Sequence, residues 1–339
     1  MTASRLPRAI RAQPGVPLRG APSLPPDAPA PPAAEPAPGP AAAPRGAEPP
    51  PQPDLHDAEL PIRHITSTKI VALRGTELEV RDDLVVGEEP LEIRAAGPLQ
   101  EPVSVAVTMR TPGHEEELAI GFMTSEGLLE ANEIVRVEYG DPGKVAQPDD
   151  SVLVRLTRPF DPALVAQRNF VATASCGICG KASIDSVAVR CEPLPEGLPF
   201  IDRAVILSLP EKLRAAQSAF DRTGGLHAAG LFETDGRLVL VREDVGRHNA
   251  LDKLIGSRAR ARELPLWDRI LMVSGRVSFE IVQKAAVAGV PIICAVSAPS
   301  DLAVRLAERL GVTLIGFLRG DGFNIYANDG RIDLRSFTR

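Results

Sequence analysis

Two cysteines, Cys176 and Cys179, stand in the segment Ser-Cys-Gly-Ile-Cys-Gly-Lys at residues 175–181. Their spacing puts both thiols on one tight turn, and the glycine after each cysteine lets the main chain fold closely around the sulfur atoms. Lys181, and a helix expected to begin just after it, favour the thiolate over the thiol. A thiolate is a nucleophile, a metal ligand or a sulfur carrier, so three kinds of chemistry are open to this pair.

A metal site is the first interpretation of the pair. Zinc takes four protein ligands, or three and a water molecule, and the chain has a single Cys-x-x-Cys. His114-Glu115-Glu116 matches the His-x-Glu half of the zinc deaminase signature, but residue 175 is Ser where the other half has Pro. His114 also lies in a turn before an acidic helix. We therefore expect no metal ligands, although zinc stays an alternative.

Redox chemistry and sulfur carriage are the other two interpretations. A thioredoxin-like pair usually follows a Trp, whereas Ser175 precedes this pair and the single Trp is Trp267. In persulfide carriage, one thiolate attacks the outer sulfur of a donor persulfide, and the neighbouring thiol resolves or relays it. A glycine-rich loop suits the transfer of a sulfur atom between two proteins, so this interpretation is favoured.

The chain divides into three segments by composition and pattern. Residues 1–58 are rich in Pro and Ala and lack a hydrophobic period, so we expect a disordered tail. Residues 59–170 read as a strand-rich α+β domain, with strands at 78–81, 91–94, 103–108 and 151–156 and an amphipathic helix over 115–129. Residues 171–335 alternate strands and helices, with the Cys-x-x-Cys loop at their start.

The alternation over 203–326 predicts an α/β sheet with a parallel portion and helices on its faces. The predicted strands are 205–207, 228–232, 238–241, 270–273, 291–296, 312–318 and 323–326, and the predicted helices are 210–220, 249–255, 278–288 and 301–310. Thr234-Asp-Gly-Arg237 indicates a hairpin between the second and third of these strands.

Polar clusters stand where these strands begin or end, at residues 223–230, 242–249, 274–280, 297–301 and 317–322. Ligands of such sheets bind outside the carboxyl ends of the strands. Small residues before a helix expose N–H groups, and an arginine beside them adds charge, which together suit a phosphate. We expect ligand contacts from Asp244, Arg247 and His248. Asp244 is also expected to cap a helix that carries Asp252 and Lys253 on its surface.

Charge and cysteine usage narrow the class of protein. The net charge is -6 and the pI is near 5.5, which argues against non-specific binding to nucleic acid or an anionic membrane. No apolar run is long enough to span a membrane. Cys294 stands in an apolar run and is expected in the core, and Cys191 has no obvious partner. Four cysteines in this pattern indicate a reducing, cytoplasmic setting.

Taken together, the motifs resemble the FdhD family of formate dehydrogenase accessory sulfurtransferases. The resemblance runs from about residue 64 to 330. It is carried by Glu117–Phe122 with Glu126 and Gly127, Ser175–Lys181, Thr223–Ala228, Glu243–Gly256, Ser274–Glu280 and Gly316–Tyr326.

This resemblance implies a carrier that takes sulfur from a cysteine desulfurase as a persulfide. The carrier passes the sulfur to the molybdenum or tungsten of the bis-molybdopterin guanine dinucleotide cofactor, which formate dehydrogenase requires. Cys176 matches the cysteine that bears the persulfide, with Cys179 as its partner. The implied fold is a cytidine-deaminase-like α/β core without the zinc site, plus a smaller strand-rich N-terminal domain, and the implied assembly is a homodimer.

The resemblance also implies where the cofactor binds. The family's cofactor-binding stretch matches Phe317, Leu318, Arg319, Gly320, Asp321 and Gly322. Its guanine dinucleotide carries anionic groups, which agrees with the strand-end clusters, so the expected site also contains Thr223, Gly224, Gly225, His227, Asp244, Arg247, His248, Ser274 and Arg276. We expect the cofactor phosphates to meet Arg242, Arg247, Arg276 and Arg319. The alternative function is a non-catalytic chaperone that binds and inserts the cofactor.

Overall fold

The computed structural model describes residues 65–140, 150–168, 193–195 and 199–335. All of them belong to one compact unit, Gln52–Arg339. The predicted tail 1–58, the loop with Cys176 and Cys179, Cys191 and the predicted domain boundary at 170 lie outside the described residues. The expectations for these segments stay predictions.

A four-stranded sheet of order β4-β3-β6-β5 forms the N-terminal layer. Its strands are β3 (Glu89–Ala96), β4 (Val103–Arg110), β5 (Ile134–Tyr139) and β6 (Ser151–Leu156), with β3 and β6 parallel and the other pairs antiparallel. Helix α1 (Glu115–Ser125) contributes Leu118 and Met123 to the buried cluster that also holds Ile93 and Val154. The strands predicted at 91–94, 103–108 and 151–156 are confirmed.

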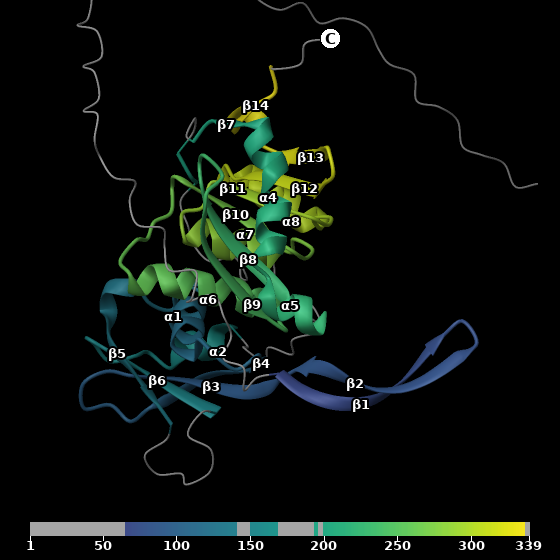
Figure 1. Ribbon diagram of the computed structural model, residues 1–339. Coiled ribbons are helices and arrows are strands. Elements are labelled where there is room, and N and C mark those ends of the chain that lie inside the picture. The colour runs from purple at the N-terminus through teal and green to yellow at the C-terminus, as the bar shows by residue number, and fades with distance from the viewer. Residues whose placement is uncertain (1–64, 141–149, 169–192, 196–198, 336–339) are drawn as a thin grey trace, which may run out of the picture. The chain divides into compact units, whose positions relative to one another are not determined.

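A six-stranded sheet of order β13-β12-β11-β10-β8-β9 forms the second layer (Figure 1). Its strands are β8 (His227–Glu233), β9 (Leu238–Asp244), β10 (Arg269–Val273), β11 (Ile292–Ala295), β12 (Thr313–Arg319) and β13 (Gly322–Ala327). Strands β10, β11 and β12 are parallel, and the other neighbours pair antiparallel. The mixed α/β class with a parallel portion is therefore confirmed, whereas the cytidine-deaminase-like label stays a prediction.

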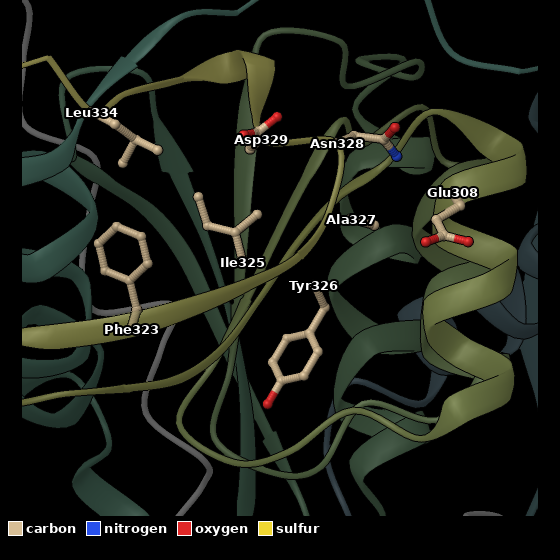
Figure 2. Close-up of a pocket in the computed structure, with 8 residues that line it drawn as sticks. All are labelled: Glu308, Phe323, Ile325, Tyr326, Ala327, Asn328, Asp329 and Leu334. Atoms are coloured by element: carbon tan, nitrogen blue, oxygen red, sulfur yellow. The ribbon is translucent and has the colours of Figure 1, made fainter. Parts of the chain in front are cut away.

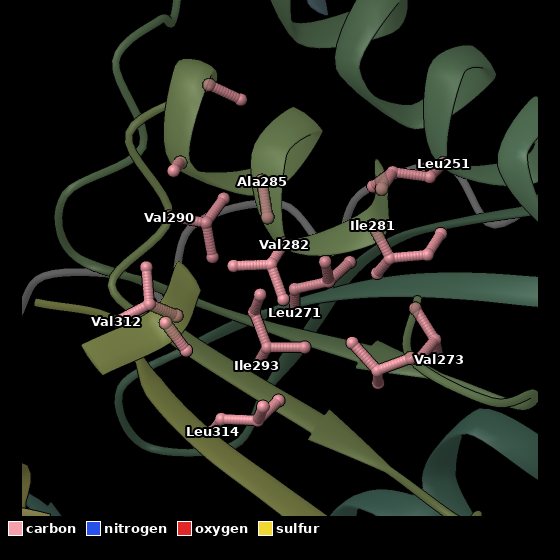
Figure 3. Close-up of a cluster of buried hydrophobic side chains, with 14 of the residues drawn as sticks. Leu251, Leu271, Val273, Ile281, Val282, Ala285, Val290, Ile293, Val312 and Leu314 are labelled. Carbon is pink, nitrogen blue, oxygen red and sulfur yellow. The ribbon is translucent and has the colours of Figure 1, made fainter. Parts of the chain in front are cut away.

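Helices cover both faces of the six-stranded sheet, so its central strands are buried apolar runs. On one face lie α6 (Arg247–Arg260), α7 (Phe279–Val287) and α8 (Asp301–Leu310). Figure 3 shows Ile281 and Val282 of α7 above Leu271 and Ile293 of the sheet. The other face belongs to the cluster that contains Ile206 and Leu209 of helix α4 (Arg203–Ala215).

The predicted strand 205–207 is wrong, because these residues lie inside α4. The Asp202 carboxylate accepts the N–H of Ala204 at 2.6 Å and caps this helix. Ile206, Leu209 and Leu213 are buried, which is a helical period rather than an alternating one. Pro210 was expected at the first turn of a helix but lies in its interior.

The remaining elements are small or stand apart from the two sheets. They are the hairpin β1 (Ile65–Arg74) and β2 (Glu77–Val86), the helices α2 (Ala163–Arg168) and α5 (Ser218–Thr223), two 3-10 turns, Ala131–Glu133 and Asp329–Arg331, and the parallel pair β7 (Ile201–Asp202) and β14 (Ile332–Asp333). Among the described residues, no helix is long and apolar enough to cross a membrane.

Candidate functional site

The predicted polar clusters meet at one edge of the six-stranded sheet. Strands β9, β10, β11 and β12 end there, and the antiparallel strands β8 and β13 begin there. The N–H of Ala228 donates to the Ser274 hydroxyl at 2.8 Å, and the N–H of Phe317 donates to the Ser297 carbonyl at 3.2 Å. The expectation that successive strand ends share one edge is thus confirmed.

Gly275 packs against a cluster of basic side chains at this edge, which we call the basic cluster: His227, Arg247 and Arg276. A Cβ on Gly275 would lie 3.2 Å from Nδ1 of His227 and 3.8 Å from Cδ of Arg247. The Nε of Arg247 is buried and has no hydrogen-bond partner among the described residues. Arg276 is exposed beside them. Burial and the charges of Arg247, His248 and Arg276 hold the pKa of His227 below its ordinary value. An anion is the ligand that would satisfy this group of donors.

His248 lies in the first turn of α6 and joins it to the start of α7. Its Nε2 is 3.0 Å from the Ser278 hydroxyl and 3.3 Å from a Glu280 carboxylate oxygen. Ser278 also donates to Glu280 at 2.8 Å. The hydrogen bond from His248 lowers the pKa of Glu280 to about 2, although burial opposes this. Ser278 and Glu280 belong to the predicted polar cluster 274–280 but were not singled out as site residues. The Ser-x-Glu at a predicted helix start was the signal that could have singled them out.

Asp244 is a buried structural group at this edge rather than the cap of α6. The N-cap of α6 is Gly246, whose N–H donates to the Asp244 carboxylate at 2.8 Å. The same carboxylate accepts the N–H of Thr111 at 3.1 Å and lies 2.7 Å from the Lys253 ammonium. Asp244 is fully buried. No part of the Asp244 carboxylate is exposed, so the structure does not support its expected contact with a ligand.

Asp252 and Lys253 are buried, so their predicted place on a helix surface is wrong. Helix α6 lies between the sheet and α1, and both of its faces are covered. Lys284 of α7 contacts both Asp252 carboxylate oxygens at 3.0 Å and a Glu126 oxygen at 2.8 Å. Burial lowers the pKa of Lys284, but the charges of Asp252 and Glu126 outweigh it and raise that pKa.

Arg242 was expected to meet phosphate, but its guanidinium is engaged elsewhere. Its Nε and Nη2 donate to the two carboxylate oxygens of Glu117 at 2.6 and 2.8 Å, and both side chains are buried. Burial raises the pKa of Glu117, yet the hydrogen bond and charge of Arg242 hold it below its ordinary value. Arg242 therefore connects β9 to α1 and is not placed to bind an anion.

The stretch Phe317–Gly322 spans the end of β12 and the start of β13. Phe317 has φ 51, a left-handed conformation that costs a bulky residue energy, and it lies within a register shift. Leu318 is fully buried in the core, so its side chain is not offered to a ligand. Arg319, with its guanidinium 5.6 Å from the Phe317 ring centre, is exposed, as are Gly320, Asp321 and Gly322.

Thr223, Gly224 and Gly225 end α5 and lead into β8 at the same edge. Gly224 caps the helix at φ 68, a conformation that favours glycine. The Thr223 hydroxyl donates to the Ala219 carbonyl at 2.8 Å, and Gly225 is exposed. The segment therefore has a conformational role, and its expected contact with a ligand stays a prediction.

Three further features of the described residues bear on the chemistry open to this chain. Cys294 is fully buried, and burial raises the pKa of its thiol, so it is the core residue that was expected. Among the described residues, no cluster of three or more His, Cys, Asp or Glu could hold a metal ion. A hollow of about 510 Å³ lies around β13 and α8, and Figure 2 shows its lining residues Phe323, Ile325 and Tyr326 on one side and Glu308 of α8 on the other. It contains none of the predicted site residues.

The amino-acid sequence is similar to that of a known protein family and of named relatives. The pattern of the FdhD/NarQ family matches residues 86–333. A protein of Streptomyces avermitilis named "Sulfur carrier protein FdhD" is 47% identical over 274 residues, which are 79% of this chain and 95% of the relative. A protein of Sulfurisphaera tokodaii with the same name is 44% identical over 270 residues, 79% of this chain and 99% of the relative.

A solved structure is also similar. A crystal structure from Desulfotalea psychrophila, provisionally described as a formate dehydrogenase accessory protein, superposes with a TM-score of 0.60 at 25% identity. The match covers 79% of this chain and 99% of that one. The arrangement of the two layers therefore has a counterpart in a solved structure.

Proposed function

Because the chain belongs to the FdhD/NarQ family, we propose that it is a sulfur carrier that serves formate dehydrogenase, with Cys176 holding the sulfur as a persulfide. One observation carries the proposal. The Cys-x-x-Cys of Ser175–Lys181 falls within the matched residues 86–333, and relatives named as sulfur carriers align over 79% of the chain. Cys179 is the resolving partner.

The proposed chemistry is thiol exchange in two steps. In loading, the Cys176 thiolate attacks the outer sulfur of a persulfide on a cysteine desulfurase. The S–S bond of the donor breaks, the donor leaves as a thiolate, and a new S–S bond forms on Cys176 without net oxidation. In delivery, the Cys179 thiolate attacks the inner sulfur. Hydrosulfide is released to the acceptor, a Cys176–Cys179 disulfide remains, and a dithiol reductant restores the pair.

The proposed acceptor is the molybdenum, or tungsten, of bis-molybdopterin guanine dinucleotide, bound here as a substrate. The basic cluster around Gly275 supports this proposal, because His227, Arg247 and Arg276 present donors and positive charge there, and the buried Nε of Arg247 has no partner among the described residues. We assign the phosphates of the guanine nucleotide to this basic cluster. Arg319 and the exposed main chain of 320–322 are the assigned contacts at the β12–β13 turn.

The proposal includes a place and partners. The sulfur donor is a cysteine desulfurase, the recipient of the finished cofactor is formate dehydrogenase, and the carrier acts in the cytoplasm as a homodimer. Reduced thiols, which the chemistry requires, are favoured in that compartment.

The test is the intact mass of the full chain after incubation with a cysteine desulfurase and cysteine. Wild type should gain about 32 Da, the mass of one sulfur atom, and Cys176→Ala should not. Cys294→Ala is the matched control, because the Cys294 thiol is buried and should not react. A gain that survives in Cys176→Ala would contradict the assignment. No gain in wild type would favour the alternative, a chaperone that binds and inserts the cofactor without carrying sulfur.

A further inference from the structure

The hairpin of β1 and β2 carries an exposed aliphatic patch at its outer end. Val71 and Leu73 of β1 are 68% and 67% exposed, and Leu78 and Val80 of β2 are 73% and 71% exposed. The strand register pairs Val71 with Val80 and Leu73 with Leu78. The four side chains therefore lie on one face as two cross-strand neighbours, and we call them the arm patch.

One face of this hairpin carries the exposed aliphatic side chains, and the other carries most of the charged ones. On the face with the arm patch, the polar pair Lys69–Asp82 and the pair Ser67–Leu84 come next toward the body, followed by Ile65 paired with Val86. Val86 packs against Ala219 and Leu226. The opposite face carries most of the charged side chains: Arg74, Glu77, Glu79, Arg81 and Asp83. Antiparallel sheets with such faces bury the apolar one and leave the polar one in water. The arm patch is the aliphatic part of its face that the described residues leave uncovered.

We propose that the arm patch is an interface with a second copy of this chain, in which two hairpins pack face to face around a two-fold axis. The inference rests on the homodimer of the proposed function and names its surface. A two-fold contact joins one surface to an identical one, so the surface must complement itself. Four aliphatic side chains without a polar atom meet that condition, because a second set closes the same apolar layer as in a β-sandwich.

The charges around the patch favour the same occupant. The hairpin carries three basic residues, Lys69, Arg74 and Arg81, and four acidic ones, Glu77, Glu79, Asp82 and Asp83. Lys69 and Asp82 pair across the strands next to the patch, on its own face. A nearly balanced surface does not repel its own copy, whereas it offers no net attraction to a nucleic acid or an anionic membrane.

Area sets a further condition. Stable interfaces bury about 1,200–2,000 Å² in total, and a patch of this kind supplies a few hundred Å² per copy. Val107 and Met109 of β4 are 53% and 37% exposed and supply more apolar surface near the root of the hairpin, because Met109 pairs with Pro90 just after β2. The proposed interface includes this surface of the second copy.

The experiment is sedimentation velocity of the full chain over a range of concentrations. Wild type should sediment as a dimer. Val80→Asp should raise the dissociation constant of the dimer at least tenfold. Thr68→Asp is the matched control, since it places the same charge on the exposed opposite face of β1. The double variant Val71→Thr with Val80→Thr keeps β-branched side chains and should weaken the dimer in the same direction. Near-ultraviolet circular dichroism confirms that each variant is folded.

Two results would overturn the inference, and they are distinguishable. A monomeric wild type would remove the homodimer itself. A dimer that is equally stable in wild type, Val80→Asp and the double threonine variant would place the interface elsewhere. The sulfur gain measured by mass is independent of both, so a dimer that carries no sulfur would contradict the proposed function and leave this interface standing.

Discussion

Gly121 of α1 and Gly256 of α6 lie against each other where the two helices cross. A Cβ on Gly121 would lie 2.8 Å from the Gly256 nitrogen, and a Cβ on Gly256 would lie 2.8 Å from the Gly121 nitrogen. The two main chains are therefore in direct contact. Helix α6 also carries Arg247 and His248 in its first turn, so this crossing connects the four-stranded layer to the helix that positions the candidate site.

Gly256→Ala should destabilise the protein, because its methyl group would come within 1.8 Å of the Glu117 carbonyl oxygen and separate the helices. Overpacking of this kind costs about 2–3 kcal/mol in the free energy of unfolding. Urea denaturation measures it. Gly330→Ala is the control, since a methyl group there meets open space and should change stability little. Equal midpoints for the two variants would show that the helices separate without cost.

Lys284→Met should destabilise the fold more than a surface lysine replacement. Removing the ammonium leaves Asp252 as a buried carboxylate without its cation, which typically costs about 3–5 kcal/mol. The double variant with Asp252→Asn should recover part of that loss, because the uncompensated charge is gone. Denaturant unfolding of wild type, both single variants and the double variant closes the cycle. Strict additivity of the two single changes would contradict the pairing.

The location of the candidate site was predictable from the sequence, whereas its buried ion pairs were not. Glycine, serine and arginine at strand ends are local signals, and the topology rule then places them at one edge. Asp252 and Lys253 are buried because α1 and α7, which are distant in sequence, cover α6 on a side other than the one that faces the sheet. Asp244 and Arg242 were misassigned for the same reason. Asp244 pairs with Lys253, and Arg242 pairs with Glu117, and both pairs form only when the chain folds.

The predicted start of α4 was wrong because a proline can lie either in the first turn of a helix or, where packing compensates, in its interior. Pro210 favours the first turn of a helix, which moved the predicted start of α4 several residues too late. The chain tolerates this proline inside the helix because Ile206, Leu209 and Leu213 bury a continuous apolar stripe. Packing therefore outweighs the local preference, and packing is what the sequence alone does not reveal.

His114→Asn should remove part of the acid sensitivity of the fold. Burial, followed by the charge of Arg242, lowers the pKa of His114 to about 4, although Glu117 and Glu115 oppose the shift and Lys253 adds to it. The unfolded chain then binds more protons between about pH 4 and pH 6.5, so stability rises with pH in that window and falls on acidification, by about 2–3 kcal/mol. Asn accepts the left-handed conformation at φ 60 and does not titrate.

The measurement for His114 is urea denaturation of both proteins from pH 4.5 to pH 7.5. The difference in unfolding free energy between wild type and His114→Asn should change across this range, with wild type losing more as the pH falls. A constant difference at every pH would mean that His114 does not titrate with a lowered pKa in the folded protein.

Arg247→Gln should weaken binding of a guanine nucleotide, with guanosine diphosphate as the probe. Its buried Nε has no partner among the described residues, and a phosphate oxygen at the basic cluster by Gly275 would supply one. Hydrogen bonds to charged groups contribute about 1.5–3 kcal/mol, so the dissociation constant should rise roughly tenfold or more. Isothermal titration calorimetry at low salt measures the dissociation constant.

Arg237→Gln is the matched control, because that arginine is paired with Glu233 in the turn between β8 and β9, at the opposite end of these strands. The same affinity in wild type and both variants would remove the phosphate assignment from the basic cluster, and the cofactor would have to bind through the β12–β13 turn alone.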